Sequence, residues 1–169
     1  MSSSPGWRPA SHRHCVGRCS VTQTGPEIHG ATQSPGSASG RLLLLTEPLS
    51  FWGGVDGVTG RIIDQRHPMA GTLLAGRVLA MPAGRGSSSS SSVLAEAIRN
   101  GSAPAAIILE EPDLIIALGA CVARLLYGIT CPVVTLAPAD YATLEDGQTY
   151  RVDADDAGCV VTREYSGPL

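Results

Sequence analysis

The apolar residues of this chain lie in short runs separated by glycine, proline and polar residues. An apolar run of four or five residues between such breakers is typical of a buried strand. Near the C-terminus, two further segments flank the acidic turn 153–158 like the arms of a hairpin. From these patterns we predict strands at 42–45, 59–64, 77–81, 105–109, 131–136, 148–152 and 159–162.

Two helices are predicted between the strands. Apolar residues at i, i+1, i+4 and i+5 within 93–99 share one face of a helix, and Gly101 is a stop signal. Residues 114–126 are apolar on nearly all sides, which indicates a helix buried on more than one side. Asp113 adds a favourable negative charge at its first turn. Residues 141–144 form at most one turn of helix.

The order of these elements predicts an α/β fold. The first predicted strands are followed by a β-α-β-α-β region and then by a C-terminal pair of strands. Strands that alternate with helices imply a partly parallel sheet with right-handed crossovers. Ligands of such sheets tend to bind at the C-terminal ends of the strands.

A glycine- and serine-rich turn lies between the predicted strand 77–81 and the first helix. It consists of Gly84-Arg85-Gly86 and six serines, residues 87–92. The first N–H groups of a helix have no intrahelical partner and the helix dipole is positive there, so the turn is a candidate site for a phosphate or carboxylate. A flexible serine linker or simple capping of the helix are the alternatives. Strand and helix signals on both sides disfavour the linker, and capping alone requires neither six serines nor two glycines.

Composition narrows the class of protein. The chain has 169 residues, 43% hydrophobic and 16% charged, with a net charge of −3. That is enough apolar material for a core, and there is no basic run for nucleic acid. Aromatic residues make up only 4%, which disfavours base-stacking surfaces. No apolar run approaches the ~20 residues of a membrane helix. We therefore expect neither nucleic acid nor membrane as a partner.

The cysteines and the N-terminus indicate a cytoplasmic protein. Five scattered cysteines do not suggest a disulfide framework, and no apolar segment of a secretory signal is present. Residues 1–40 lack apolar periodicity and are predicted to be a disordered extension, followed by one domain at 41–163 and a short tail at 164–169. Two histidines near Cys15 and Cys19 fit no closed zinc spacing, so no metal site is expected on this chain.

Several motifs, in order, resemble the swivel-domain small subunit of the AcnX branch of the aconitase superfamily. The similarity covers roughly residues 41–162. The motifs are Gly60–Asp64, His67-Pro68, Gly71, Ala75–Leu79, Gly84–Ser88, Pro104–Ile108, Pro112 and Gly119. The turn alone would be weak evidence, whereas the ordered set is fairly specific.

The resemblance implies a swivelling β/β/α domain that closes over a large subunit holding an iron–sulfur cluster, as a heterodimer or larger assembly. It implies one subunit of a hydro-lyase that dehydrates a small hydroxy acid, with cis-3-hydroxy-L-proline the first expectation. A phosphomevalonate dehydratase small subunit and a non-catalytic, anion-binding docking domain are the alternatives. The cluster is expected in the large subunit.

The resemblance also implies roles for the turn. By motif position Ser87 matches the serine that acts as a base next to a substrate carboxylate. The substrate-binding candidates are Gly84, Arg85, Gly86, Ser88 and Ser89. A run of identical residues leaves the register open by one position.

Other residues remain open between a functional and a structural role. Because histidine side chains in general can exchange a proton near neutral pH, His67 is a possible acid–base group or subunit contact, but a loop histidine beside a proline is as well explained structurally. Glu110 and Glu111 are adjacent and need not face each other, which favours a solvated pair. Trp52 is either an interface anchor or a core residue.

Overall fold

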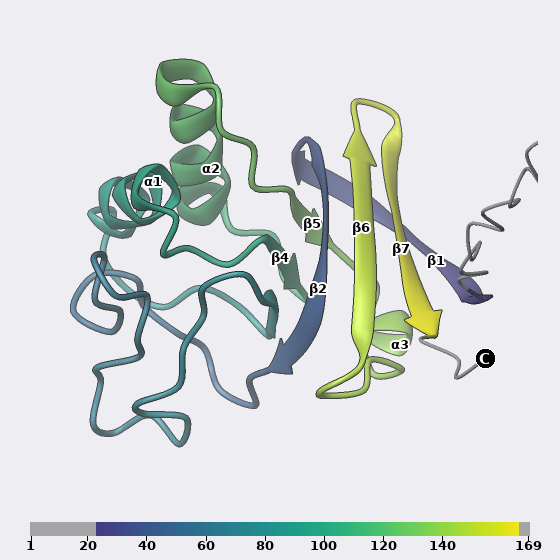
Figure 1. The fold of residues 1–169 in the computed structure, drawn as a ribbon, viewed down its shortest axis with the longest axis horizontal. Helices are drawn as coiled ribbons and strands as arrows, with labels where there is room; N and C mark the ends of the chain where they lie inside the picture. Colours follow the sequence, from purple (N-terminus) through teal and green to yellow (C-terminus); the bar gives the residue numbers. More distant parts are fainter. Residues whose placement is uncertain (1–22, 166–169) are drawn as a thin grey trace, which may run out of the picture.

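The structure is a computed structural model and describes residues 23–165, which form a β-barrel with two helices packed against one side (Figure 1). The elements in chain order are β1 (Gln23–Ser34), β2 (Gly36–Leu44), β3 (Val78–Met81), α1 (Ser90–Asn100), β4 (Ala106–Leu109), α2 (Leu114–Tyr127), β5 (Val133–Thr135), α3 (Pro138–Tyr141), β6 (Thr149–Asp155) and β7 (Gly158–Tyr165).

The barrel closes in the order β1-β5-β4-β3-β2-β6-β7. Its central part, β2 to β5, is parallel, and β1, β6 and β7 pair antiparallel with their neighbours. The prediction of an α/β fold with a partly parallel sheet is confirmed. The predicted C-terminal hairpin is also confirmed, as β6 and β7.

The parallel strands separate two hydrophobic cores. Alternate residues of β3, Val78 and Ala80, face the barrel interior, while Leu79 and Met81 face α1 and α2. Both faces of β3 are fully buried. This two-sided burial explains why the parallel strands are continuous apolar runs in the sequence.

The predicted strand at 59–64 is wrong. Only isolated bridges occur there, between Val55 and Ile62 and between Arg61 and Leu73. Gly60 has φ +68°, which turns the chain out of the extended conformation. The segment between β2 and β3 is instead a long loop that pairs with itself and lies beside α1 (Figure 1).

The prediction of disorder through residue 40 is wrong for residues 23–40. These residues form β1 and most of β2. Apolar periodicity is weak because β1 is held mainly by backbone pairing, with β7 along most of its length and β5 at its end. Residues 1–22, including the histidine and cysteine cluster near Cys15, lie outside the described residues. The predicted boundary at 163 falls inside β7, which continues to Tyr165, and residues 166–169 lie outside the described part of the chain.

Helix α2 departs from its predicted burial. One face packs against α1 through Gly119, where a Cβ would lie 3.1 Å from the Leu94 Cβ. The opposite face is exposed, as shown by Leu114 and Leu125. The expectation of burial on more than one side is therefore wrong for this chain by itself. Between residues 23 and 165 no helix is long and apolar enough to cross a membrane.

Candidate active site

The predicted anion site lies where β3 ends and α1 begins. After Met81 the chain runs beside the loop that follows β2, and the Arg85 amide donates a hydrogen bond to the Leu49 carbonyl at 3.1 Å. The N-terminus of α2 lies against the same turn. A small hollow of about 10 Å³ results, lined by Gly84, Arg85, Gly86, Ser87, Ser90, Asp113, Ile115 and Ile116.

Gly84 and Asp113 form one wall of this hollow. A Cβ on Gly84 would overlap the Asp113 Oδ2 atom, so a larger residue would have to displace the Asp113 carboxylate. The other Asp113 oxygen, Oδ1, accepts hydrogen bonds from the amides of Ile115 at 2.8 Å and Ile116 at 3.1 Å. Asp113 is thus the N-cap of α2 and satisfies that helix end internally. Its contact with Gly84 was not predicted from the sequence.

Replacing Asp113 with alanine should lower the free energy of unfolding by about 1 kcal/mol, because two amides of α2 lose their acceptor. Asp113→Asn keeps a side-chain oxygen in place and should stay within about 0.5 kcal/mol of wild type. Urea denaturation followed by circular dichroism measures both. Equal losses would show that the charge, rather than the hydrogen bonds, stabilises this helix end.

The start of α1, in contrast, keeps free backbone donors. The N-cap residue Ser89 makes no side-chain capping bond. Ser87 Oγ accepts a hydrogen bond from the Ser89 amide at 3.2 Å. Among residues 23–165, the amides of Gly86, Ser87 and Ser88 meet no protein acceptor. Successive unpaired amides at a helix N-terminus are a favourable site for an anion.

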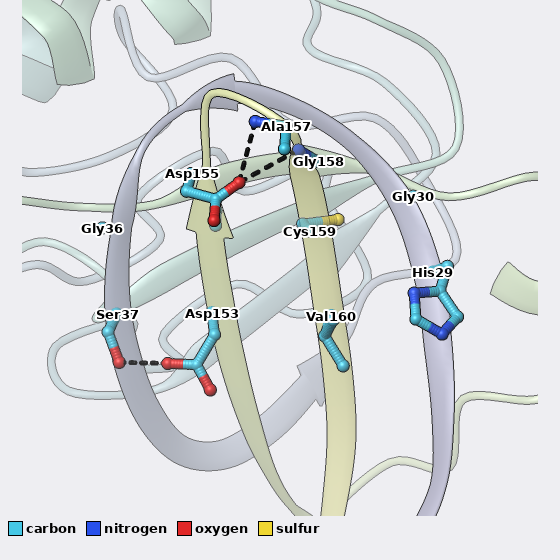
Figure 2. A pocket seen from close by; sticks show the side chains of 11 residues that line it. His29, Gly30, Gly36, Ser37, Asp153, Asp155, Ala157, Gly158, Cys159 and Val160 are labelled. Atoms are coloured by element: carbon cyan, nitrogen blue, oxygen red, sulfur yellow. Dashed lines mark hydrogen bonds between the residues drawn. The ribbon is translucent and has the colours of Figure 1, made fainter.

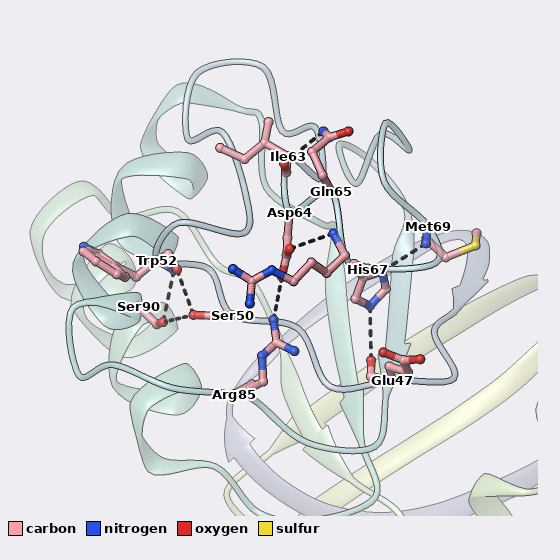
Figure 3. A network of polar contacts seen from close by, with 11 residues as sticks. Glu47, Ser50, Trp52, Ile63, Asp64, Gln65, His67, Met69, Arg85 and Ser90 are labelled. Atoms are coloured by element: carbon pink, nitrogen blue, oxygen red, sulfur yellow. Dashed lines mark hydrogen bonds and ion pairs between the residues drawn. The ribbon is translucent and has the colours of Figure 1, made fainter.

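Arg85 forms an ion pair that was not anticipated. Its Nη2 lies 2.6 Å from Asp64 Oδ2, and the Arg66 amide donates to Asp64 Oδ1 at 3.0 Å (Figure 3). The Arg66 N–H and then the Arg85 guanidinium hold the pKa of Asp64 below its usual value. The Arg85 side chain is still 52% exposed, so the remaining N–H groups can bind a second carboxylate.

His67 is buried in the loop between β2 and β3. Its Nδ1 accepts a hydrogen bond from the Met69 amide at 3.1 Å, which leaves the proton on Nε2, 3.4 Å from the Glu47 carbonyl (Figure 3). Both ring nitrogens therefore contact backbone, and His67 does not line the hollow. This geometry favours a structural role, bracing two loop segments.

Ser90, the first residue of α1, joins the turn to the loop that follows β2. The sequence did not distinguish it from the neighbouring serines. It is buried, and its Oγ accepts from the Trp52 amide at 3.1 Å and lies 3.3 Å from Ser50 Oγ (Figure 3). Phe51 is fully buried and Trp52 is exposed. The aromatic pair thus divides between a core residue and a surface residue.

The predicted site residues are brought together only in part. Gly84, Arg85, Gly86 and Ser87 line one hollow. Ser88 and Ser89 are exposed and do not line the hollow. The Ser88 amide is unpaired, whereas the Ser89 amide donates to Ser87 Oγ. The adjacent Glu110 and Glu111 amides both donate to the Pro82 carbonyl, which ties β4 to the start of the turn.

The described residues do not fit an iron–sulfur cluster. Within residues 23–165, no three histidine, cysteine or acidic side chains are arranged to hold a metal ion. Burial raises the pKa of Cys131 to about 12 and that of Cys159 to about 11. Cluster ligands are thiolates, so these protonated core thiols are unsuited to the role.

A larger hollow of about 710 Å³ lies on the barrel, where β1 turns into β2 and β6 into β7 (Figure 2). Its acidic side chains already have partners. Asp153 accepts from Ser37 and pairs with Arg151, and Asp155 accepts from two amides of its own turn. Both acidic side chains of this hollow are therefore already engaged within the fold.

A family model described as the aconitase X swivel domain matches residues 27–162. The chain is 52% identical over 120 residues to cis-3-hydroxy-L-proline dehydratase of Pseudomonas aeruginosa, which covers 67% of this chain and 21% of that protein. It is 44% identical over 131 residues to the phosphomevalonate dehydratase small subunit of Methanothermobacter thermautotrophicus, covering 77% of this chain and 95% of that subunit.

A solved structure agrees with these similarities. The fold matches Thermococcus kodakaraensis aconitase X (holo-form) with a TM-score of 0.71 and 36% identity, over 82% of this chain and 98% of that one. The chain spans about one fifth of the length of the cis-3-hydroxy-L-proline dehydratases that it matches, 21% in Pseudomonas aeruginosa and 19% in Hypocrea jecorina.

Proposed function

Because this chain belongs to the aconitase X swivel-domain family, we propose that it is the swivel component of a hydro-lyase that dehydrates a small hydroxy acid. The observation that carries the proposal is the Ser87 hydroxyl, which accepts the Ser89 amide at the N-terminus of α1. It lies beside unpaired backbone amides on a turn where a Cβ at Gly84 would meet the Asp113 carboxylate.

Ser87 is proposed as the base that removes the proton from the carbon next to the substrate carboxylate. The electrons of that C–H bond form a C=C bond as the hydroxyl on the adjacent carbon leaves, so that water is the second product. A serine hydroxyl is a weak base, and its alkoxide requires stabilisation. The Ser89 N–H and the positive end of α1 supply it.

Substrate binding is proposed for the turn around this serine. The amides of Gly86, Ser87 and Ser88 and the exposed part of Arg85 suit a carboxylate. The hollow of about 10 Å³ is far smaller than a typical ligand pocket of roughly 300–1,000 Å³. A second surface must therefore enclose the substrate.

We propose that this surface belongs to a large subunit of the aconitase X type, which also holds the iron–sulfur cluster. The small-subunit relatives and the lack of a ligand set among residues 23–165 support this arrangement. The proton transfer at Ser87 is the step that this chain's own residues carry.

Two substrates are candidates. The 52% identity to the Pseudomonas aeruginosa enzyme favours cis-3-hydroxy-L-proline. The match to 95% of an archaeal small subunit, at 44% identity, makes phosphomevalonate the second candidate. Backbone amides bind a carboxylate or a phosphate equally well, so the local geometry does not choose between them.

The deciding experiment is a dehydration assay on this chain purified together with the aconitase X-type large subunit of the same organism. We expect turnover of cis-3-hydroxy-L-proline by the complex and none by either subunit alone. Turnover of phosphomevalonate alone would assign the second substrate. An intact, cluster-loaded complex that is inactive on both would contradict the dehydratase proposal.

A further inference from the structure

The outer face of α2 is unusually apolar for an exposed helix surface. Leu114 and Leu118 are 81% and 54% exposed, and Leu125 and Leu126 are 76% and 68% exposed. The first three recur at i, i+4 and i+11, which places them on one side of the helix, and Leu126 widens that side. We call these four residues the α2 stripe.

Residues 23–165 leave this stripe uncovered. The opposite face of α2, including Ile116, Ala120 and Ala123, is buried against α1 and the sheet. Arg124 is the one charged residue among the fourteen of the helix. A helix that is apolar all round belongs in an interior, and large exposed apolar patches mark interaction sites.

The stripe begins at the candidate active site. Leu114 directly follows Asp113, whose carboxylate forms the wall beside Gly84. A protein seated on the stripe would therefore reach the edge of the hollow that contains Ser87.

We propose that the α2 stripe is the docking surface for the large subunit, an inference that rests on the proposed function. The matched residues make up 21% of the Pseudomonas aeruginosa relative, so in that protein about four fifths of the chain lies outside the swivel domain. A second component of this size needs a contact surface, and the stripe is both apolar and continuous with the site.

The charges at the two ends of the stripe define the chemistry of the partner. Glu110, Glu111 and Asp113 precede Leu114 at the end near the site, while Arg124 adjoins Leu125 at the other end. A complementary surface is an apolar strip with basic groups near the active site and an acidic group at the far end.

Two other occupants are less suitable. The arginines of residues 1–22 would suit the acidic end of the stripe, but this segment contains few apolar residues to cover the leucines. A second copy of this chain could pair its stripe antiparallel, but it would bring no group to complete the site. Both possibilities are outcomes of the test below.

The test compares Leu118→Gln/Leu125→Gln with wild type for binding to the large subunit by isothermal titration calorimetry. Glutamine is as good a helix former as leucine, and both sites are exposed, so the fold should persist. Loss of two central anchors should weaken binding about 100-fold. Leu73→Gln, at an exposed apolar residue outside the stripe, is the matched control and should bind like wild type.

Unchanged binding of the double variant, with its circular dichroism spectrum intact, would overturn the inference and leave the dehydratase proposal standing. Sedimentation of the chain alone tests for a second copy, and calorimetry on a form lacking residues 1–22 tests for the N-terminal segment, whose removal would tighten large-subunit binding if it occupied the stripe. Dimers that the double variant abolishes would assign the stripe to a second copy. Conversely, a wild-type complex that forms through the stripe but dehydrates neither substrate would contradict only the proposed function.

Discussion

Replacing Ser87 with alanine is expected to lower the turnover number of the assembled dehydratase about a thousandfold, in the range typical for loss of a general base. The change removes the hydroxyl that accepts the Ser89 amide and leaves the backbone amides of the turn in place. Substrate affinity and large-subunit binding should therefore change little. Steady-state kinetics with cis-3-hydroxy-L-proline, together with a binding measurement, separates these effects.

The serine run itself provides the control. Ser92 is exposed on α1 and does not line the hollow, so Ser92→Ala should keep wild-type activity. If Ser88→Ala loses turnover and Ser87→Ala retains it, the base is one position further along the run. If every serine variant remains active within a complete complex, the chain acts as a docking domain and the assignment of a serine base is wrong.

Replacing Gly60 with alanine is expected to lower the free energy of unfolding by about 3 kcal/mol, among the larger losses for a single substitution. Gly60 has φ +68°, and a Cβ there would overlap the backbone carbonyl oxygen of Ser102. Neither atom can move easily, since Ser102 is buried and its hydroxyl donates to the Gly57 carbonyl at 2.7 Å. The loop between β2 and β3 would separate from the end of α1.

Gly76→Ala is the matched control for this change. Gly76 has φ +69°, nearly the same as Gly60, and nothing lies within 4 Å of its added Cβ. It should lose only the conformational part, about 1 kcal/mol. Thermal and urea unfolding of the two variants isolate the steric part as their difference. Equal losses would mean that Ser102 shifts freely and that the loop is not held there.

The loop braced by Gly60 also holds the partner of Arg85. Asp64 lies four residues later and is 2.6 Å from the Arg85 guanidinium, while His67 bonds the same loop to the Glu47 carbonyl. The position of Arg85 beside the Ser87 turn thus depends on a segment without regular secondary structure. This explains why the glycine and His-Pro motifs of this loop accompany the Gly-Arg-Gly-Ser turn in the sequence.

The sequence by itself determined the parallel half of the fold and the location of the candidate site. Strands β3 and β4 were predictable because burial on both faces produces an unbroken apolar run, and α1 because its buried residues keep helical spacing. The serine turn was identified because a glycine-rich segment between a strand and a helix leaves the first backbone amides of the helix unpaired. This effect is local and does not depend on where the rest of the chain lies.

Only the tertiary structure decided the features that depend on residues far apart in the chain. The polar strand β1 is held by backbone pairing with β7 and β5, for which its side chains give no periodic signal. The pairing of Arg85 with Asp64 and the contact of Gly84 with Asp113 join separate loops. The apolar pattern of α2 suggested burial, but which face the chain covers and which it leaves exposed is set by packing against α1.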